Sequence, residues 1–278
     1  MYRLDLGTSI KPFNKDGFNE NYYRDLKEVK NQGIQSVEVS LGRVGGYKMT
    51  VEKCLMQLED ALKAVQDEGL ILNSIHMPFQ RFIYISSYDG SVRAWAISEF
   101  RDLISVCDKY NPFHYVFHSK TPSKDQPFWD VRKPALIRSF SEMVGMTSNH
   151  ICIENMVGSF PNTLADMVEI LKEVENGYCC LDMNHFLQDT TQDAILALGE
   201  RIKTVHVCDY DGVYEKHWMP KQGVNNWMEI ISALEKVGYN GGFIYELYEE
   251  KYGYTYAQIR KNYEELFEEY NNVYRRKE

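Results

Sequence analysis

The sequence predicts an α/β fold, a closed (β/α)8 barrel that spans residues 1–278 as a single domain. Short apolar runs alternate with longer stretches of helical periodicity from one end of the chain to the other, and there are eight of each. The length of 278 residues also suits one such barrel, which typically needs about 250 residues. An open doubly wound sheet is the alternative that the same alternation allows.

The eight strand candidates are short and mostly apolar. They cover residues 2–9, 36–41, 70–77, 114–119, 150–155, 178–183, 202–209 and 241–247. Parallel strands of a barrel are buried on both faces and need crossover helices between them, which accounts for their apolar character.

Helix candidates with apolar residues three and four positions apart follow the strands. They cover about residues 21–31, 51–68, 91–109, 131–146, 162–174, 191–199 and 227–237, with a last helix from about residue 255. Gly33 and Gly69 follow the first two, and glycine ends helices because the left-handed conformation costs it little. Asn162 or Thr163 is the expected N-cap of the fifth helix.

Polar side chains favour the closed barrel over the open sheet. Seven strand candidates carry one within the strand or at its end: Glu38, His76, His118, Glu154, Asp182, His206 and Glu246. A barrel brings such residues together at one mouth, where the active sites of TIM barrels lie, whereas an open sheet would spread them along an edge. The sequence therefore predicts a functional site at the C-terminal ends of the strands.

The residue types at these positions indicate metal binding. Carboxylates and imidazoles without obligatory thiolates suit Mn²⁺, Zn²⁺, Mg²⁺, Co²⁺ or Fe²⁺, and the mixture does not choose among these ions. Glu154 and Glu246 end apolar strands, where a buried charge needs a partner, either a metal or a structural Arg or Lys. Asp182 and His206 lie on the two intervening strands and favour the metal.

Some of these residues also have simpler interpretations. His76 and His118, each followed by a proline, would singly be hydrogen-bonded histidines near strand ends, but their matching places in consecutive units favour a site. Glu38 is assigned to the scaffold, because its strand carries no histidine.

The loop after the seventh strand adds further polar residues. Asp209 and Asp211 in DYDG could as easily be turn formers as ligands, and neither is assigned as a ligand. His217 beside Trp218 fits a substrate contact, a metal ligand or a solvated loop residue equally well.

Composition limits the partners. The formal charge is −9, from 31 basic and 40 acidic residues, which disfavours nucleic acid. The six cysteines show no CxxC spacing, which favours a reducing cytoplasm, and no apolar run approaches the roughly 20 residues of a membrane helix. Gly45-Gly46 predicts a hairpin or flexible loop. The aromatic segment from Tyr252 to Tyr274 is expected to pack on its own barrel or on a partner, which leaves a homo-oligomer open.

An ordered set of short motifs resembles one known superfamily. The set SIHMP, FHS, IENM, LDMNH, VHVCD, EKHWMPKQG and IYEL resembles the xylose isomerase-like TIM-barrel superfamily, specifically its sugar phosphate isomerase/epimerase group, which includes the endonuclease IV type of apurinic-site nuclease. The resemblance covers nearly the whole chain. In the ketose 3-epimerases of this superfamily one divalent metal is held by residues that correspond to Glu154, Asp182, His206 and Glu246, and the two glutamates are catalytic.

The resemblance also implies roles for other residues. His185 corresponds to a substrate-contacting or additional metal-binding histidine. The nuclease branch holds three zinc ions with further ligands that resemble His76, His118, His185, Glu215 and His217, and Glu215 stands where the nuclease has Asp. The epimerases usually carry an Arg after strand seven, whereas here only Lys216 and Lys221 are available.

The resemblance implies a metal-dependent isomerase or epimerase of a small sugar or sugar phosphate, which acts by proton transfer next to a metal-polarised carbonyl. Two alternatives remain. One is a metal-dependent phosphodiesterase of the endonuclease IV type, which predicts a basic DNA-binding face. The other is a non-catalytic barrel that binds sugars.

Overall fold

The computed structural model describes residues 1–14, 17–42, 51–79, 84–122 and 124–275, and the segment around Gly45-Gly46 lies outside this part of the chain. Eight parallel strands close into a barrel in the order β1-β12-β11-β10-β8-β6-β5-β4. They are β1 (Asp5–Ile10), β4 (Ser36–Ser40), β5 (Ile71–His76), β6 (His114–Phe117), β8 (His150–Glu154), β10 (Gly177–Asp182), β11 (Ile202–Val207) and β12 (Gly242–Tyr245). Each strand matches one predicted from the sequence. The closed barrel is confirmed, and the open sheet is excluded.

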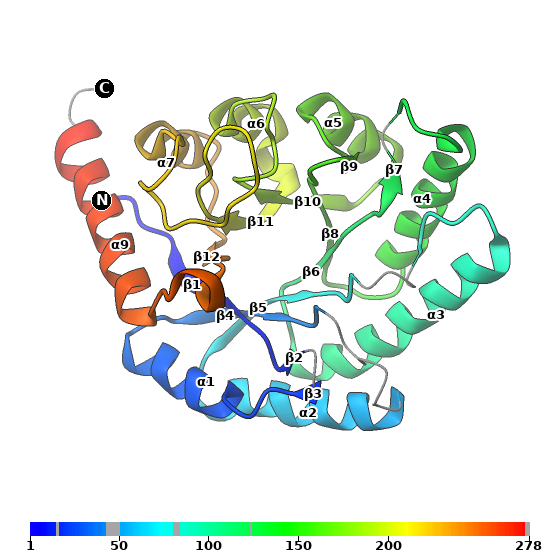
Figure 1. The fold of residues 1–278 in the computed structure, drawn as a ribbon, viewed down its shortest axis with the longest axis horizontal. Coiled ribbons are helices and arrows are strands. Elements are labelled where there is room, and N and C mark those ends of the chain that lie inside the picture. The colour runs from blue at the N-terminus through cyan, green and yellow to red at the C-terminus, as the bar shows by residue number, and fades with distance from the viewer. Residues whose placement is uncertain (15–16, 43–50, 80–83, 123, 276–278) are drawn as a thin grey trace.

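Helices between the strands surround the barrel (Figure 1). They are α1 (Tyr22–Asn31), α2 (Val51–Asp67), α3 (Gly90–Cys107), α4 (Trp129–Val144), α5 (Leu164–Glu173), α6 (Thr191–Leu198), α7 (Trp227–Lys236) and α9 (Tyr256–Glu269). Gly33 and Gly69 follow α1 and α2 with φ of +70° and +66°, as expected for glycines that end helices. Thr163 is the N-cap of α5, and its side chain accepts a hydrogen bond from the backbone N–H of Asp166 in a capping box.

Several short elements were not predicted. Two-residue strands pair antiparallel outside the barrel, β2 (Phe13–Asn14) with β3 (Gly17–Phe18) and β7 (Thr121–Pro122) with β9 (Ser159–Phe160). A one-turn helix, α8 (Glu249–Tyr252), follows β12. Elements of two to four residues are too short for a hydrophobic period to develop, so the sequence carries no signal for them.

The barrel interior is arranged in levels that follow the alternation of side chains along each strand. At the N-terminal level His114 of β6 contacts His150 of β8, and their Nδ1 atoms are 3.1 Å apart. Val116, Cys152 and Cys180 form a buried cluster at the middle level. The C-terminal level holds the predicted site residues. The intervening residues of these strands, such as Ile153 and Leu181, belong to the larger core that includes the buried residues of the helices.

The aromatic C-terminal segment packs on its own barrel. Tyr263, Phe267 and Tyr270 are buried, and the ring of Phe267 lies 5.4 Å from that of Phe243 on β12. Figure 1 shows α9 beside the N-terminus, where the backbone N–H of Tyr2 donates to Asn271 Oδ1 at 2.8 Å. Of the two predicted packing modes, the chain therefore shows the first.

None of the helices in the described ranges is both long and apolar enough to cross a lipid bilayer.

Candidate functional site

Four acidic and histidine side chains from consecutive strands meet at the C-terminal mouth of the barrel. Glu154 ends β8, Asp182 ends β10, His206 lies near the end of β11, and Glu246 directly follows β12. One ligand atom from each lies within 4.8 Å of the other three. Glu154, Asp182 and His206 are buried, and the side chain of Glu246 is 18% exposed. The strand register pairs Asp182 with His206, so β10 and β11 place these two residues side by side.

His206 lies at the centre of this first donor set. Its Nδ1 atom is 3.1 Å from Glu246 Oε2, 3.3 Å from Glu154 Oε1 and 3.7 Å from Asp182 Oδ2. One imidazole nitrogen therefore faces three carboxylates.

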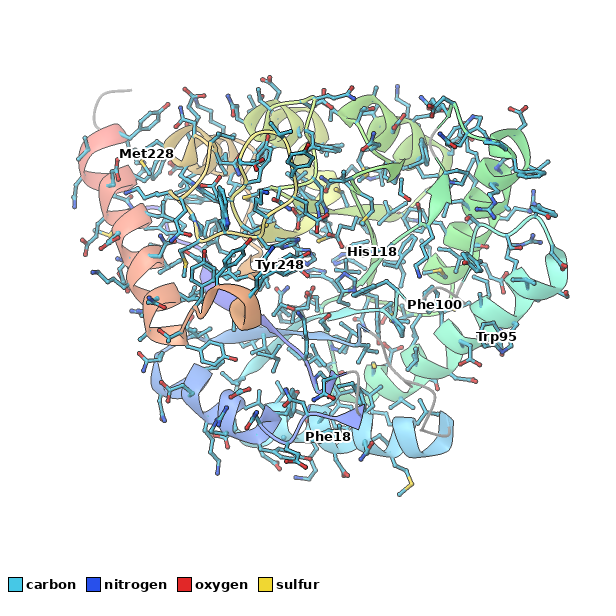
Figure 2. All side chains as sticks on the ribbon, viewed as in Figure 1. Phe18, Trp95, Phe100, His118, Met228 and Tyr248 are labelled. Atoms are coloured by element: carbon cyan, nitrogen blue, oxygen red, sulfur yellow. The ribbon has the colours of Figure 1, made fainter. Side chains whose placement is uncertain are left out.

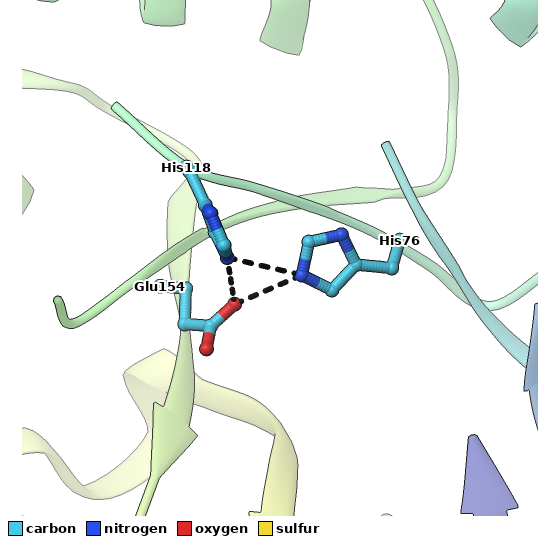
Figure 3. A group of neighbouring side chains, drawn as sticks. All are labelled: His76, His118 and Glu154. Atoms are coloured by element: carbon cyan, nitrogen blue, oxygen red, sulfur yellow. Dashed lines mark hydrogen bonds and ion pairs between the residues drawn. The ribbon is translucent and has the colours of Figure 1, made fainter. Parts of the chain in front are cut away.

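A second donor set joins His76, His118 and Glu154 (Figure 3). The Nε2 atoms of the two histidines are 3.1 Å apart and lie 3.1 Å and 2.9 Å from Glu154 Oε2. Such spacing suits three ligands around one ion at about 2 Å from each. Figure 2 shows His118 near the middle of the view and Trp95 towards its edge.

A third donor set consists of Asp182, His185 and His217. Glu215 lies next to it, because its Oε1 atom is 2.9 Å from His217 Nε2 and 3.7 Å from His185 Nε2. The structure therefore brings together every predicted site residue, although the ligand roles themselves stay predictions.

Three of these histidines are oriented by the backbone. The Nδ1–H of His76 donates to the Met77 carbonyl at 3.0 Å, that of His185 to the Asn155 carbonyl at 2.8 Å, and that of His217 to the Glu246 carbonyl at 3.0 Å. Nε2 is then the nitrogen left to bind a ligand. The Nε2 atom of His185 is buried and has no hydrogen-bond partner. Metal-binding histidines commonly have this arrangement.

The pKa values of the site residues are shifted because several charged groups are buried close together. Burial raises the pKa of Asp182 to about 6, with a further contribution from the negative charges of Glu154 and Glu246. Burial alone would lower the pKa of His76, but its hydrogen bond to Glu154 and the negative charge there raise it to about 9. At neutral pH and without a metal, the carboxylates are therefore largely ionised, and protonated histidines such as His76 balance their charge.

The donor chemistry fits a divalent metal. Buried carboxylates and imidazoles converge on common points, and one imidazole nitrogen is buried without a partner. Burial raises the pKa of the nearby Cys180 thiol well above its usual value, so this cysteine stays protonated. Oxygen and nitrogen donors of this kind suit Mn²⁺, Zn²⁺, Co²⁺ or Fe²⁺.

Asp209 anchors the loop that carries Glu215 and His217. Its carboxylate is fully buried and accepts hydrogen bonds from the backbone N–H groups of Lys221, Gly223 and Asn225 and from Trp227 Nε1. A Cβ at Gly223 would lie 2.1 Å from the Tyr210 carbonyl oxygen, so only glycine fits there. Of the two interpretations of Asp209, these hydrogen bonds agree with a residue that shapes the loop.

The tip of the same loop is held by Asp211, whose carboxylate accepts from the backbone N–H groups of Val213 and Tyr214. The two lysines that stand in place of the expected Arg are both paired with acids. Lys216 Nζ is 3.0 Å from Asp211, and Lys221 pairs with Glu269.

Sequence reasoning missed two aromatic rings at the mouth and a thiol at the middle level of the barrel, next to the site residues. The ring of Phe79 stacks on His118 at 4.9 Å, and that of Tyr248 stacks on His217 at 4.2 Å. The Tyr248 hydroxyl also donates to Glu215 Oε1 at 2.8 Å. Cys180 forms a further potential ligand group with Glu154 and His206. Its position two residues before Asp182 was the available signal, since such residues share a strand face.

A family model described as xylose isomerase-like TIM barrel matches residues 26–272. The chain belongs to this family. The resemblance stated from the sequence motifs is thereby confirmed.

Solved structures of sugar 3-epimerases share its fold. D-psicose 3-epimerase from Clostridium cellulolyticum H10, crystallised with D-tagatose, is 16% identical with a TM-score of 0.75, over 97% of this chain and 99% of that one. An L-ribulose 3-epimerase is 16% identical with a TM-score of 0.76, over 99% and 97%. D-allulose 3-epimerase from Methylomonas sp., in complex with D-allulose, is 14% identical with a TM-score of 0.75, over 96% and 97%. No curated protein matches the sequence.

Proposed function

We propose that this protein is a divalent-metal-dependent isomerase or epimerase that acts on a small sugar or sugar phosphate. The observation that carries the proposal is the convergence of Glu154, Asp182, His206 and Glu246 within 4.8 Å at the barrel mouth. Two glutamates next to one metal position suit proton transfer beside a carbonyl. The sugar 3-epimerases among the similar structures support the same reaction class.

Glu154, Asp182, His206 and Glu246 would hold the ion. When bound, a divalent cation polarises the carbonyl and hydroxyl oxygens of a substrate and so makes the adjacent C–H more acidic. These four side chains fix the position of the ion because each sits on or directly after a barrel strand.

The two glutamates differ in how accessible they are to a substrate. Both oxygens of Glu154 contact histidines, Oε1 at 3.3 Å from His206 and Oε2 at 2.9 Å from His118. Glu246 is 18% exposed, and although burial opposes its ionisation, the positive charge of His206 lowers its pKa. Glu246 is therefore ionised and accessible, and we assign it the removal of the substrate proton. In an epimerisation, Glu154 takes up a proton from solvent and delivers it to the opposite face of the reacting carbon, while Glu246 releases the abstracted proton to solvent.

The test is turnover of a panel of ketoses, ketose phosphates and inositol derivatives by metal-replete protein in heavy water. Solvent deuterium is expected on the reacting carbon of the product. Glu154→Gln and Glu246→Gln should each abolish turnover while some substrate binding remains. Product without solvent deuterium, together with an active Glu246→Gln enzyme that keeps its metal, would reject the two-glutamate mechanism.

A second candidate function is a metal-dependent phosphodiesterase. The observation that favours it is the presence of two further donor sets, which share Glu154 and Asp182 with the first. Two or three adjacent ions would activate water and stabilise a leaving oxygen. The net charge of −9 opposes the phosphate contacts that dominate DNA affinity, so we expect no useful cleavage of apurinic DNA.

Metal stoichiometry and substrate choice separate the two candidates. Elemental analysis of the purified chain gives the number of bound ions, and assays with apurinic DNA and with a small chromogenic phosphodiester give the hydrolytic activity. Sugar turnover without phosphodiester cleavage supports the first candidate. Efficient cleavage of either phosphodiester at physiological salt by protein free of contaminating nuclease would favour the second.

A further inference from the structure

His206 is oriented differently from three other histidines of the site. In His76, His185 and His217 the Nδ1–H group donates to a backbone carbonyl, which leaves Nε2 to bind a ligand. In His206 the relation is reversed, because Nδ1 faces the carboxylates and Nε2 faces away from them. The group that meets Nε2 is the carboxylate of Glu38, whose Oε2 atom is 3.0 Å away.

Glu38 reaches His206 from a distant strand. It lies in the middle of β4, which is separated from β11 by β1 and β12 in the closed sheet. The carboxylate is fully buried, and its Oε2 atom also accepts a hydrogen bond from Ser74 Oγ at 2.8 Å. Ser74 Oγ in turn accepts from Asn73 Nδ2 at 3.1 Å. A short chain of hydrogen bonds therefore fixes one oxygen of Glu38 against the imidazole.

A buried carboxylate in this place is costly. Within the described part of the chain no Lys or Arg pairs with Glu38, and its Oε1 atom has no hydrogen-bond partner. An apolar side chain would fill the barrel interior at lower cost. Among the described residues, the ion pair of Glu38 is with His206. The carboxylate therefore has an effect on that imidazole that an apolar residue would lack.

We propose that Glu38 is a positioning residue of the metal centre, which keeps the proton of His206 on Nε2 and so presents the lone pair of Nδ1 to the ion. A carboxylate that accepts from the second ring nitrogen fixes the tautomer and the ring orientation, and it makes the metal-binding nitrogen a better donor. Glu38 thus does for His206 what backbone carbonyls do for His76, His185 and His217. The inference rests on the proposed metal centre and extends it to a residue that does not touch the ion.

The experiment compares metal affinity in the full-length chain and in its Glu38→Gln variant. Glutamine keeps the shape of the side chain but not the negative charge. We expect Mn²⁺ binding to weaken by about 10- to 100-fold in calorimetric titration of metal-stripped protein, the range found when outer partners of metal ligands are removed. In zinc-loaded protein labelled with ¹⁵N-histidine, NMR should place the proton of His206 on Nε2, and Glu38→Gln should shift or abolish that proton signal.

Two serine variants form a matched pair of controls. Ser74→Ala removes the hydrogen bond that orients Glu38 and leaves the carboxylate in place, so a smaller loss of metal affinity is expected. Ser139→Ala removes an equally buried hydroxyl that donates to the Ile85 carbonyl, and it should leave metal affinity unchanged. The pair separates a local effect on His206 from a general loss of stability, and Ser74→Ala provides the test if Glu38→Gln does not fold.

The outcomes separate this inference from the proposed function. Metal affinity in Glu38→Gln within twofold of the unmodified chain, or a proton on Nδ1 of His206 in the zinc-loaded protein, would overturn the role of Glu38. Failure of the unmodified chain to bind Mn²⁺ or Zn²⁺ would reject both the metal centre and this role. Metal binding without any sugar turnover would count against the proposed function alone.

Discussion

The two ends of the barrel hold similar residues in different electrostatic surroundings. At the C-terminal mouth, His76 and His118 face the carboxylate of Glu154. At the N-terminal end, His114 and His150 stack on each other with their ring centroids 5.2 Å apart. The same two strands, β6 and β8, supply residues to both ends.

The difference shows in the pKa values. His76 and His114 are both buried, which by itself lowers the pKa of a histidine. The carboxylate of Glu154 reverses this effect and raises the pKa of His76 to about 9. At the other end, burial and the positive charges of His150 and Lys203 together lower the pKa of His114 to about 3. A buried pair of histidines is therefore not in itself a metal site, and the neighbouring carboxylates distinguish the two ends.

Substitutions at the two ends of the barrel should differ most in their effect on catalysis. Glu246→Gln should lower sugar turnover by about 10²- to 10⁴-fold, the usual contribution of one positioned acid or base. His114→Gln, at the opposite end, should change turnover little. Steady-state rates on the substrate found in the panel, with metal content measured in parallel, make the comparison. Equal losses in both variants would contradict the assignment of the chemistry to the C-terminal mouth.

The second largest difference between substitutions at the two ends should be in metal affinity. The double variant Asp182→Ala, His206→Ala should bind divalent metal more than about 100-fold more weakly, because it loses two direct ligands where the loss of one outer partner already costs 10- to 100-fold. The double variant His114→Ala, His150→Ala should retain the metal. Elemental analysis after dialysis is the measurement, and full metal content in the first variant would reject the ligand assignment.

The smallest expected effect is a pH dependence of opposite sign at the two ends of the metal-free protein. Between pH 3 and the ordinary histidine pKa of about 6.5, the unfolded chain binds a proton that folded His114 does not. This residue should thus cost about 2 kcal/mol of folding free energy when pH falls from 7 to 5. His76, whose pKa is raised to about 9, stabilises the fold below pH 6.5 and loses that contribution as pH rises through 9.

Denaturant unfolding at a series of pH values from 4 to 10 measures the free energy of unfolding, and so shows both the loss of stability at acid pH (the acid limb) and the loss at alkaline pH (the alkaline limb). His114→Gln should flatten the acid limb, and His76→Gln should flatten the alkaline one. An acid limb that is unchanged in His114→Gln would show that this histidine is not held neutral in the folded protein.

The sequence predicted the fold well because the barrel depends on local patterns. Apolar runs at residues 150–155 and 178–183 correspond to β8 and β10, and the polar residue at the end of each run marks the mouth. These patterns also identified Glu154 and Asp182 as neighbours in the site.

The contacts that orient the site residues could not be predicted from these sequence patterns. Glu38 was assigned to the scaffold, and nothing in its strand indicates that it meets His206, because contacts between distant strands depend on the stagger with which the barrel closes. Which nitrogen of His206 faces the carboxylates depends on the same contact. The stacking of Tyr248 on His217 depends on a loop whose shape is set by hydrogen bonds to Asp209 rather than by a hydrophobic period.

The anchoring of the loop by Asp209 has a consequence for protein engineering. Its carboxylate is fastened to the far end of the loop by Gly223, Asn225 and Trp227, so the two ends of the segment are held together independently of its tip. The tip, where Val213 and Tyr214 are largely exposed, is therefore the part of the loop that we expect to tolerate substitution best. We expect substitutions at Val213 and Tyr214 to leave the base of the loop in place, provided that Glu215 and His217, which follow the tip, are kept.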